Sequence, residues 1–294
     1  MEETLPRPYP PKFFDLLNEV FEEEERGRKT YDELRHNPSS ASVKINGNVV
    51  GACLRNLWYK ANKEPESDPK TLSNKLQASF GNSIHDLILS KLQKSDKIKI
   101  TPESAGRVSV EGLEKVVSFR LDGLVNHKGE YGGLEIKTMQ GFGLTKMVKD
   151  GGPKEHDLLQ VISYFETNEL IRWFVLLYIA RDTAYRLEYH IWRDPKTNSF
   201  MLEDVSHSKE PRPIEGLTFE GIVNRWKELE GYVNSKVIPP RDYKAVLTKD
   251  GRLTDKRTKN GVDYKTDWRC QYCSYKTKCW TLPDAKDYAY KIGD

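Results

Sequence analysis

The chain has 294 residues, of which 37% are hydrophobic, so it is long enough to bury a core and does not resemble a disordered protein. No apolar run approaches the roughly 18 to 20 residues that cross a bilayer, and the start is acidic and Pro-rich, unlike a secretory signal. We therefore expect a cytoplasmic protein with no membrane association. The net charge of +3 permits nucleic-acid binding without requiring it.

The first strong periodicity follows an N-terminal stretch that we expect to be polar and irregular. In residues 1–45 the acidic run at 22–25 is typical of a solvated helix face. From residue 71, apolar side chains recur every four positions, which predicts one stripe of a helix about six turns long. The members of this stripe are Leu72, Leu76, Phe80, Ile84, Ile88 and Leu92.

A strand pair is predicted next. In the run 116–125, Val117 and Phe119 alternate with polar neighbours, as in a half-buried strand that carries Asp122 on its polar face. The polar, Gly-containing stretch 126–132 reads as a connection to a second strand at 133–138. A hairpin is the natural interpretation.

The remaining periodicities complete the predicted core. Helical spacing is found at 155–169 and 219–233, and strand alternation at 173–180 and 185–193. The order predicts an α/β fold with a mixed central β-sheet flanked by helices. The basic stretch 241–269 holds nine Lys or Arg against five Asp and is predicted to be a long loop or a weakly structured insertion. We divide the chain into an N-terminal extension (1–50), a core (51–240) and a C-terminal basic and cysteine region (241–294).

The chemistry centres on Asp122, Glu135 and Lys137. Because strand side chains alternate, Glu135 and Lys137 share one face while Leu134 and Ile136 point into the core. Carboxylate oxygens suit Mg²⁺ or Mn²⁺, and a neighbouring ammonium can position or help to deprotonate an attacking water. On its own, E-x-K in a strand is common, usually as an exposed cross-strand charge set.

The flanking helices add further polar residues. Gly81 and His85 lie four residues apart on one helix face, and a glycine inside a helix costs about 1 kcal/mol relative to Ala, which suggests the close approach of another backbone. Gln160 and Tyr164 share a face of the following helix. Taken singly, His85 is better explained as a surface or hydrogen-bonded core histidine.

Together these features resemble the RecB-like branch of the PD-(D/E)XK nucleases. That family shows, in order, G-x-x-x-H on a helix, Asp on a strand, (D/E)-x-K on the next strand and Q-x-x-x-Y on a helix. Here they stand as GNSIH at 81–85, LDG around Asp122, EIKT at 135–138 and QVISY at 160–164. The resemblance covers roughly residues 50–195 and the C-terminal cysteine segment. It implies a restriction-endonuclease-like core.

The resemblance also implies a role for each residue. His85, Asp122, Glu135 and the Ile136 carbonyl would bind Mg²⁺ or Mn²⁺, while Lys137 would serve the attacking water. Gln160 and Tyr164 would complete the site. Hydrolysis of a phosphodiester requires charge neutralisation and a generated hydroxide, which a metal held by these groups would supply.

Four cysteines form the second pattern, and three of them lie within ten positions near the C-terminus. Cys270, Cys273 and Cys279 supply three thiolates, and Cys53 is the only candidate for the fourth. With no export signal, a metal site is favoured over disulfides. The segment from Cys53 to Tyr59 is similar to the N-terminal cysteine segment of RecB-like nucleases with a 4Fe-4S cluster. They include CRISPR-associated adaptation nucleases and AddB-type subunits.

This resemblance implies a mainly structural 4Fe-4S cluster that joins the N- and C-terminal segments. Structural Zn²⁺ is the alternative, although zinc sites more often present two C-x-x-C pairs, and only one is present here. Arg55 and Tyr164 are candidate DNA contacts. For Arg55, a surface arginine is the simpler interpretation.

The sequence thus predicts a metal-dependent deoxyribonuclease. We expect an exonuclease that acts on single-stranded DNA or duplex ends in recombination, repair, or phage or CRISPR-associated DNA processing, in the host cytoplasm if it is phage-encoded. The basic stretch and aromatic residues would guide a single strand. The alternative is a DNA-binding subunit without turnover in a larger complex with protein partners.

Overall fold

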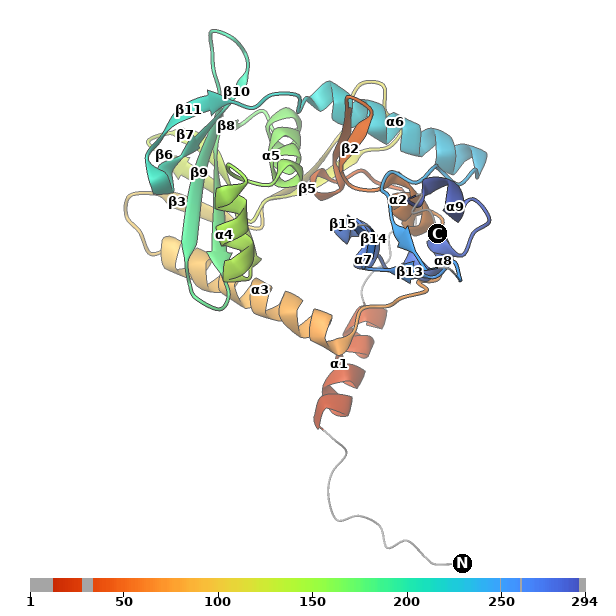
Figure 1. Cartoon of the computed structure of the whole chain (residues 1–294). Coiled ribbons are helices and arrows are strands. Elements are labelled where there is room, and N and C mark those ends of the chain that lie inside the picture. Colours follow the sequence, from red (N-terminus) through yellow and green to blue (C-terminus); the bar gives the residue numbers. More distant parts are fainter. Residues whose placement is uncertain (1–12, 28–33, 249, 260, 291–294) are drawn as a thin grey trace, which may run out of the picture.

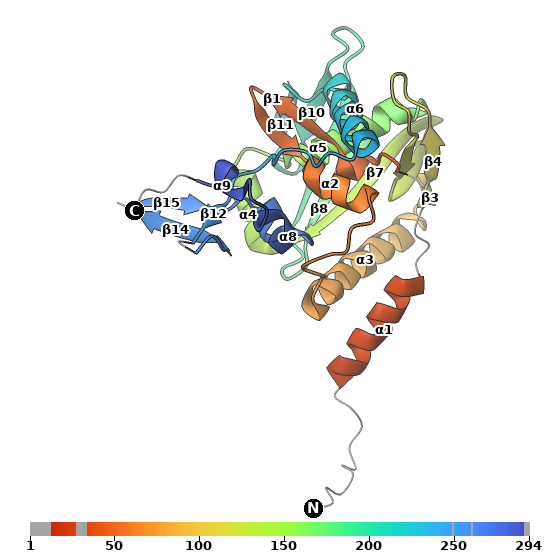
Figure 2. The ribbon, with the colours of Figure 1, turned by 90° about the vertical axis from the view of Figure 1, so that its right-hand side faces the viewer.

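The computed structural model describes residues 13–27, 34–248, 250–259 and 261–290 (Figures 1 and 2). The helices are α1 (Phe13–Gly27), α2 (Leu54–Ala61), α3 (Leu72–Leu92), α4 (Gly141–Lys149), α5 (Glu155–Thr167), α6 (Phe219–Ser235), α7 (Trp268–Gln271), α8 (Lys276–Trp280) and α9 (Ala285–Tyr288), with 3-10 turns η1 (Pro38–Ser40) and η2 (Val205–His207). Across these residues, none of the helices combines the length and apolar character needed to span a bilayer.

A seven-stranded mixed sheet forms the centre of the molecule. Its strands, in spatial order, are β11 (Lys209–Pro213), β10 (Phe200–Asp204), β9 (Arg186–Arg193), β8 (Ile171–Ala180), β7 (Glu130–Met139), β6 (Gly123–His127) and β3 (Lys99–Pro102). β7 and β8 run parallel, with Glu135 opposite Leu176, whereas the other neighbours are antiparallel. The predicted α/β class with a mixed sheet flanked by helices is confirmed.

Short two-stranded sheets surround this centre. They are β1 (Ser42–Ile45) with β2 (Asn48–Gly51), β4 (Ala105–Val108) with β5 (Val117–Arg120), β12 (Val246–Leu247) with β13 (Leu253–Thr254), and β14 (Lys256–Lys259) with β15 (Val262–Lys265). The last two pairs lie within the basic stretch 241–269. The prediction of a long loop or weakly structured insertion there was therefore wrong in part, because these paired strands are only two to four residues long and too short to show a periodicity.

The alternation of β7 and β8 divides the core into two layers. On one face, Phe174 and Leu176 pack with α4, α5 and α6 in the larger core cluster. On the other face, Leu134 and Ile136 pack with Val125 and with Leu89 of α3. The prediction that Leu134 and Ile136 point into the core is confirmed, and Glu135 and Lys137 consequently point toward α5.

The predicted helix from Leu72 to Leu92 is confirmed, but not all of its apolar stripe is buried. Phe80 is 60% exposed. None of the six predicted stripe residues is fully buried; the buried residues of α3 are Lys75, Gly81 and Leu89, so the predicted stripe is not the face that packs most closely. The helices at 155–169 and 219–233 and the strands at 173–180 and 185–193 are also present, with boundaries shifted by a few residues.

The predicted strand at 116–125 is broken in two. β5 pairs with β4, and β6 pairs with β3 and β7, so the chain changes sheet at Leu121 and Asp122. The hydrophobic alternation hides this break because Leu121 remains fully buried within it. Asp122 therefore lies at a junction between two strands instead of on a strand face.

The connection predicted at 126–132 is much shorter in the structure. β6 continues to His127 and β7 begins at Glu130. Gly132 and Gly133 both belong to β7. A Cβ on Gly132 would lie 2.2 Å from the Trp173 ring of β8, and a Cβ on Gly133 would lie 2.1 Å from the Phe174 ring. These glycines make room for large side chains and do not form a turn.

Candidate active site

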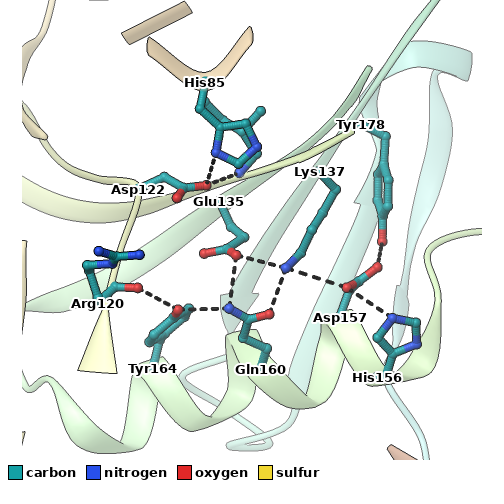
Figure 3. Close-up of polar contacts among 11 residues, drawn as sticks. His85, Arg120, Asp122, Glu135, Lys137, His156, Asp157, Gln160, Tyr164 and Tyr178 are labelled. Atoms are coloured by element: carbon teal, nitrogen blue, oxygen red, sulfur yellow. Dashed lines mark hydrogen bonds and ion pairs between the residues drawn. The ribbon is translucent and has the colours of Figure 1, made fainter. Parts of the chain in front are cut away.

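Glu135 is the most enclosed acidic residue of the predicted set. Its side chain projects from β7 toward α5 and the residue is 6% exposed. Oε1 accepts hydrogen bonds from Lys137 Nζ at 2.8 Å and from Gln160 Nε2 at 2.9 Å (Figure 3). Oε2 is buried and has no hydrogen-bond partner among the residues that the structure describes. A buried carboxylate oxygen without a donor is costly unless a cation binds there.

The charge of Glu135 depends on its neighbours. Burial raises the pKa of Glu135 to about 7, while the Lys137 ammonium opposes this shift and the Asp122 carboxylate adds to it. For Lys137, burial lowers the pKa, but Glu135 and Asp157 outweigh it and the net shift is upward. The pair is therefore an ammonium beside a carboxyl group that a further cation would keep ionised.

Asp122 reaches the same place from the junction between β5 and β6. Its Oδ2 accepts the Ile136 N–H at 2.7 Å, which fixes the carboxylate beside the β7 backbone. The same oxygen lies 3.4 Å from Nδ1 of His85 on α3. Figure 3 shows His85, Asp122 and Glu135 approaching one another from a helix, a junction and a strand.

Gln160 and Tyr164 support this group from α5. The Gln160 Oε1 accepts from Lys137 Nζ at 2.7 Å, and its Nε2 donates to the Tyr164 hydroxyl at 2.8 Å. The hydroxyl in turn donates to the Arg120 carbonyl at 2.7 Å. A continuous chain of hydrogen bonds therefore runs from the end of β5 through α5 to the two charged side chains of β7, and it holds the side chains in place.

Three residues of this network were missed in the sequence. Asp157 is buried, accepts from the Tyr178 hydroxyl at 2.6 Å and lies 3.6 Å from Lys137 Nζ. His156 Nε2 lies 3.4 Å from the same carboxylate. Asp157 lies three positions before Gln160 in the same helix, and this spacing was a signal that could have been used. Tyr178 gave no signal, since its ring resembles any other apolar position of β8.

A cleft of about 1160 Å³ opens over these residues. Asp122, Glu135, Gln160 and Tyr164 line one side, and the start of α2 and the C-terminal segment line the other, whereas His85 and Lys137 are not among the lining residues. Its polar, aromatic and cysteine lining includes Cys53, Asn56, Lys60, Arg107, Arg120, Asp122, Glu135, His156, Gln160, Tyr164, Trp268, Arg269, Tyr272 and Cys273.

The four cysteines meet beside one end of this cleft. All four line one small cavity, although Cys53 comes from the start of α2 and the others from the C-terminal segment. All four are free thiols. Two N–H groups point at Cys273 Sγ, from the Asn56 amide at 3.1 Å and the Tyr275 backbone at 3.4 Å. N–H donors around sulfur are what a metal-bound thiolate requires from its surroundings.

The Glu135 network and the cysteine cavity are the two places where a metal could bind, and they offer different kinds of ligand atom. Among the described residues, no group of three or more His, Cys, Asp or Glu side chains is arranged to hold a metal ion as it stands. Burial raises the pKa of Cys53 to about 12, with Asp242 adding to the shift, so without a metal this thiol is protonated at neutral pH. The first place has an unpartnered carboxylate oxygen, and the second has four thiols around one cavity; oxygen suits Mg²⁺ or Mn²⁺, and sulfur suits zinc or iron.

Arg55 does not fit the predicted DNA contact. It is only 3% exposed, and its guanidinium donates to the Pro239 carbonyl at 2.6 Å and to Asp284 at 3.0 Å. Asp284 also forms an ion pair with Arg241, with 2.8 Å between the two side chains. Arg55 thus joins α2 to the C-terminal segment beside the cysteines. Tyr164 does line the cleft, but its buried hydroxyl is already paired.

No protein-family model and no curated protein match the chain. Among solved structures, it is similar to the crystal structure of the protein SSO0001, with 16% identity and a TM-score of 0.47 over 92% of this chain and 95% of the other. It is also similar to the alkaline exonuclease LHK-Exo from Laribacter hongkongensis, with 11% identity and a TM-score of 0.39 over 63% of this chain and 79% of the other. The complex of LHK-Exo with dAMP gives 12% identity and the same TM-score and coverage. Our functional conclusion rests on the site itself.

Proposed function

We propose that the protein is a divalent-metal-dependent deoxyribonuclease. The observation that carries this proposal is the buried, unpartnered Oε2 of Glu135, which lies in a network that also holds Asp122 and Lys137. Such an oxygen is suited to Mg²⁺ or Mn²⁺, which prefer carboxylate and carbonyl ligands. The order of the motifs, which resembles the RecB-like nucleases, supports the same assignment.

Each residue has a role that its contacts support. Asp122, Glu135, the Ile136 carbonyl and His85 would hold the metal, which when bound neutralises phosphate charge and lowers the pKa of a water. Lys137 orients the attacking water through its ammonium and stays charged because Glu135 and Asp157 raise its pKa. Gln160 and Tyr164 fix Lys137 and Glu135 relative to each other.

The substrate that we propose is DNA, as single strands or duplex ends. The exonuclease preference rests on the resemblance of the motifs, and the pathway would be recombination, repair, or phage or CRISPR-associated DNA processing. The exposed Lys60, Arg107 and Arg120 at the cleft support phosphate binding.

We also propose that the chain is organised as an N-terminal extension (1–50), a nuclease core (51–240) and a C-terminal basic and cysteine region (241–294).

Digestion of end-labelled DNA tests this function. We expect cleavage of single-stranded or end-containing DNA with Mg²⁺ or Mn²⁺, none with a chelator, and a loss of at least a hundredfold in Glu135→Gln and in Lys137→Ala. Lys146→Ala is the matched control, because that lysine is exposed and its ammonium pairs with Asp150 at the surface end of α4. Cleavage that survives both site substitutions would contradict the assignment.

The second candidate function is a DNA-binding subunit without turnover. It would share the fold and the cleft, and it needs no ionised Glu135. Binding of DNA without cleavage under every metal condition, in the presence or absence of protein partners, would favour it. The charged Lys137 and the unpartnered Glu135 oxygen argue for turnover instead.

We further propose that Cys53, Cys270, Cys273 and Cys279 bind a 4Fe-4S cluster, with structural Zn²⁺ as the alternative. The shared cavity and the N–H groups around Cys273 support a site built from four cysteines. Protein purified without oxygen should contain about four irons and four sulfides per chain and show visible absorption. Cys53→Ala should lose the cluster. One zinc per chain would favour the alternative, and neither metal would contradict both.

A further inference from the structure

Two exposed aromatic side chains belong to the C-terminal segment yet line the candidate active-site cleft. Trp268 is 50% exposed and Tyr272 is 76% exposed, and both lie in the cleft wall together with Asp122 and Glu135. Figure 1 shows this segment in blue, with α7 on the side that faces the sheet. Large aromatic side chains left open to solvent in a cleft often mark a binding surface.

Trp268 is held close to the catalytic candidates. Its ring centroid lies 5.8 Å from that of His156, whose Nε2 is 3.4 Å from Asp157. On its own helix, the Arg269 guanidinium lies 4.8 Å from the Trp268 ring centroid and is fixed by an ion pair with Asp267. The indole is therefore oriented before any ligand arrives, which reduces the entropy lost on binding.

Both rings lie on the short segment that carries Cys270 and Cys273. Trp268 comes two residues before Cys270, and Tyr272 directly precedes Cys273. The Asn56 amide of α2 donates a hydrogen bond to Cys273. Between Trp268 and Tyr272, backbone N–H groups donate to the carbonyls of Asp267 and Trp268, which holds this turn of helix together. The two aromatic residues thus stand on a short, anchored segment and not on a free loop.

Positive charge accompanies the aromatic pair. Lys60, Arg107 and Arg120 are exposed at the cleft, and the stretch 241–269 carries +4, more than the +3 of the whole chain. Aromatic faces next to cations match a nucleic-acid strand, in which bases alternate with phosphates. The faces of paired bases inside a duplex are already stacked on each other, so a base from within a strand must be unpaired to lie between or on these rings.

We propose that Trp268 and Tyr272 form a base-stacking site that selects an unpaired DNA strand and leads it toward Glu135. This inference rests on the proposed function, because it names the form of DNA that the same cleft accepts. The site is distinct from the metal-binding candidates and acts through binding. Stacking tolerates any base, so the selection is for strandedness and not for sequence.

Binding measured without turnover tests the stacking site. The full chain with Glu135→Gln is titrated with fluorescent oligonucleotides in the presence of a chelator, and anisotropy is recorded. Three ligands of one length are compared: a mixed-sequence single strand, the same strand with abasic sites throughout, and its blunt duplex. Trp268→Leu and Tyr272→Leu are added singly and together, with Tyr185→Leu as the matched control, since Tyr185 is exposed but is not among the residues lining the cleft.

We expect each cleft substitution to weaken binding of the normal single strand by about 5- to 150-fold. Binding of the abasic strand and of the duplex should change less than about twofold, and Tyr185→Leu should bind all three ligands as the parent does. Thermal unfolding and the iron or zinc content show whether each variant keeps its fold and its cysteine site.

Three results would overturn the stacking site. They are unchanged binding in the double variant, an equal loss for the abasic strand, or no preference of the parent for the strand with bases. Because the test uses no metal and no cleavage, its failure is separable from failure of the nuclease proposal, which the digestion of end-labelled DNA measures. If the protein cleaves duplex ends but shows none of the expected binding differences, the nuclease proposal stands and the stacking site is wrong.

Discussion

Tyr164 shows how one hydroxyl can hold a whole site. It is buried, donates to the Arg120 carbonyl and accepts from Gln160, which in turn contacts both Glu135 and Lys137. The hydroxyl is already paired with Gln160 and with the Arg120 carbonyl, so it acts on the proposed reaction through Gln160. We therefore regard it as a positioning residue of the proposed reaction.

Tyr164→Phe should slow the proposed reaction more than it weakens substrate binding. Without the hydroxyl, Gln160 loses a partner and the Arg120 carbonyl loses its donor, which costs about 1–3 kcal/mol of stability. Misplacement of Lys137 should lower kcat by about ten- to a hundredfold and leave KM nearly unchanged. Steady-state cleavage of labelled DNA and thermal unfolding provide the two measurements.

Tyr189→Phe is the matched control for that substitution. Tyr189 is equally buried, but its hydroxyl has no hydrogen-bond partner within the described part of the chain. Its removal should be neutral or stabilising and should leave kcat unchanged. A Tyr164→Phe enzyme with the kcat of the parent would show that the hydrogen-bond chain does not position Lys137.

The site residues differ in how far the sequence could reveal them. Glu135 and Lys137 follow from strand alternation, and Gln160 and Tyr164 from helical spacing, so their shared faces were predictable. The spacing of Asp157 from Gln160 also places these two residues on one helix face, but the contact of Asp157 with Lys137 depends in addition on how α5 lies across β7. The burial of Arg55 was equally hidden, since its partners Pro239 and Asp284 lie 184 and 229 positions away in the chain.

At the scale of elements, the packing of α3 on β7 determines where His85 can lie. Gly81 is buried at this contact, and a Cβ there would lie 2.8 Å from the Thr138 hydroxyl of β7. The close approach of another backbone that we predicted for this glycine is not found, because the near neighbour is a side-chain oxygen. His85 follows one turn later on the same helix.

Gly81→Ala should push α3 away from β7 and lower the cleavage rate. Movement of α3 would shift His85 relative to Asp122, and a shift of about 1 Å between the two side chains should lower the rate by about a hundredfold. The double variant Gly81→Ala with Thr138→Ala should recover much of the rate, because the clashing oxygen is gone. Rates on labelled DNA measured alongside thermal unfolding separate a displaced helix from an unfolded one.

Gly231→Ala supplies the control on a helix away from the site. This glycine lies in α6, and a Cβ there would meet no atom within 4 Å. The substitution should stabilise the protein by about 1 kcal/mol through helix propensity and leave the rate unchanged. If Gly81→Ala behaves in the same way as Gly231→Ala, close packing of α3 does not matter for the site.

Element type was predictable where periodicity ran long. The helices α3, α5 and α6 and the strands β8 and β9 each span eight or more residues with one consistent period. β3, β4, β10 and β11 have only four or five residues, many of them polar and exposed, so no alternation marks them. The break at Asp122 was hidden because Leu121 stays buried when the chain changes sheet.

At the scale of the whole molecule, Glu230 joins three distant parts of the chain. Its carboxylate on α6 accepts from the backbone N–H of Glu114 and of Lys115 at 3.0 and 2.9 Å, and lies 2.8 Å from Nε2 of the buried His36. The His36 ring stacks on Trp226 with centroids 5.1 Å apart. The segment around residue 36, the approach to β5, and α6 are all held by this one group.

Both titratable groups of this joint favour neutral or alkaline pH. For His36, burial lowers the pKa and Glu230 only partly opposes it, so the unfolded chain takes up this proton first, near pH 6.5. For Glu230, burial would raise the pKa, but the N–H donors and His36 outweigh it and lower it. Its contribution to stability is present above about pH 4.3 and is lost as the pH falls through its folded pKa.

Stability should therefore fall as the pH drops from 7.5 to 5, and His36 should account for part of that fall. His36→Gln removes the titrating ring but keeps an amide donor for Glu230. We expect the variant to be less stable than the parent at pH 7.5 by about 1–3 kcal/mol, with a flatter dependence on pH. The flattening should be on the order of 1 kcal/mol between pH 7.5 and 5. Denaturant unfolding at several pH values measures both quantities.

His127→Gln is the control for this prediction, because His127 lies at the exposed end of β6, and the variant should keep the pH dependence of the parent. Equal slopes in the parent and in His36→Gln would show that this joint does not link folding to pH.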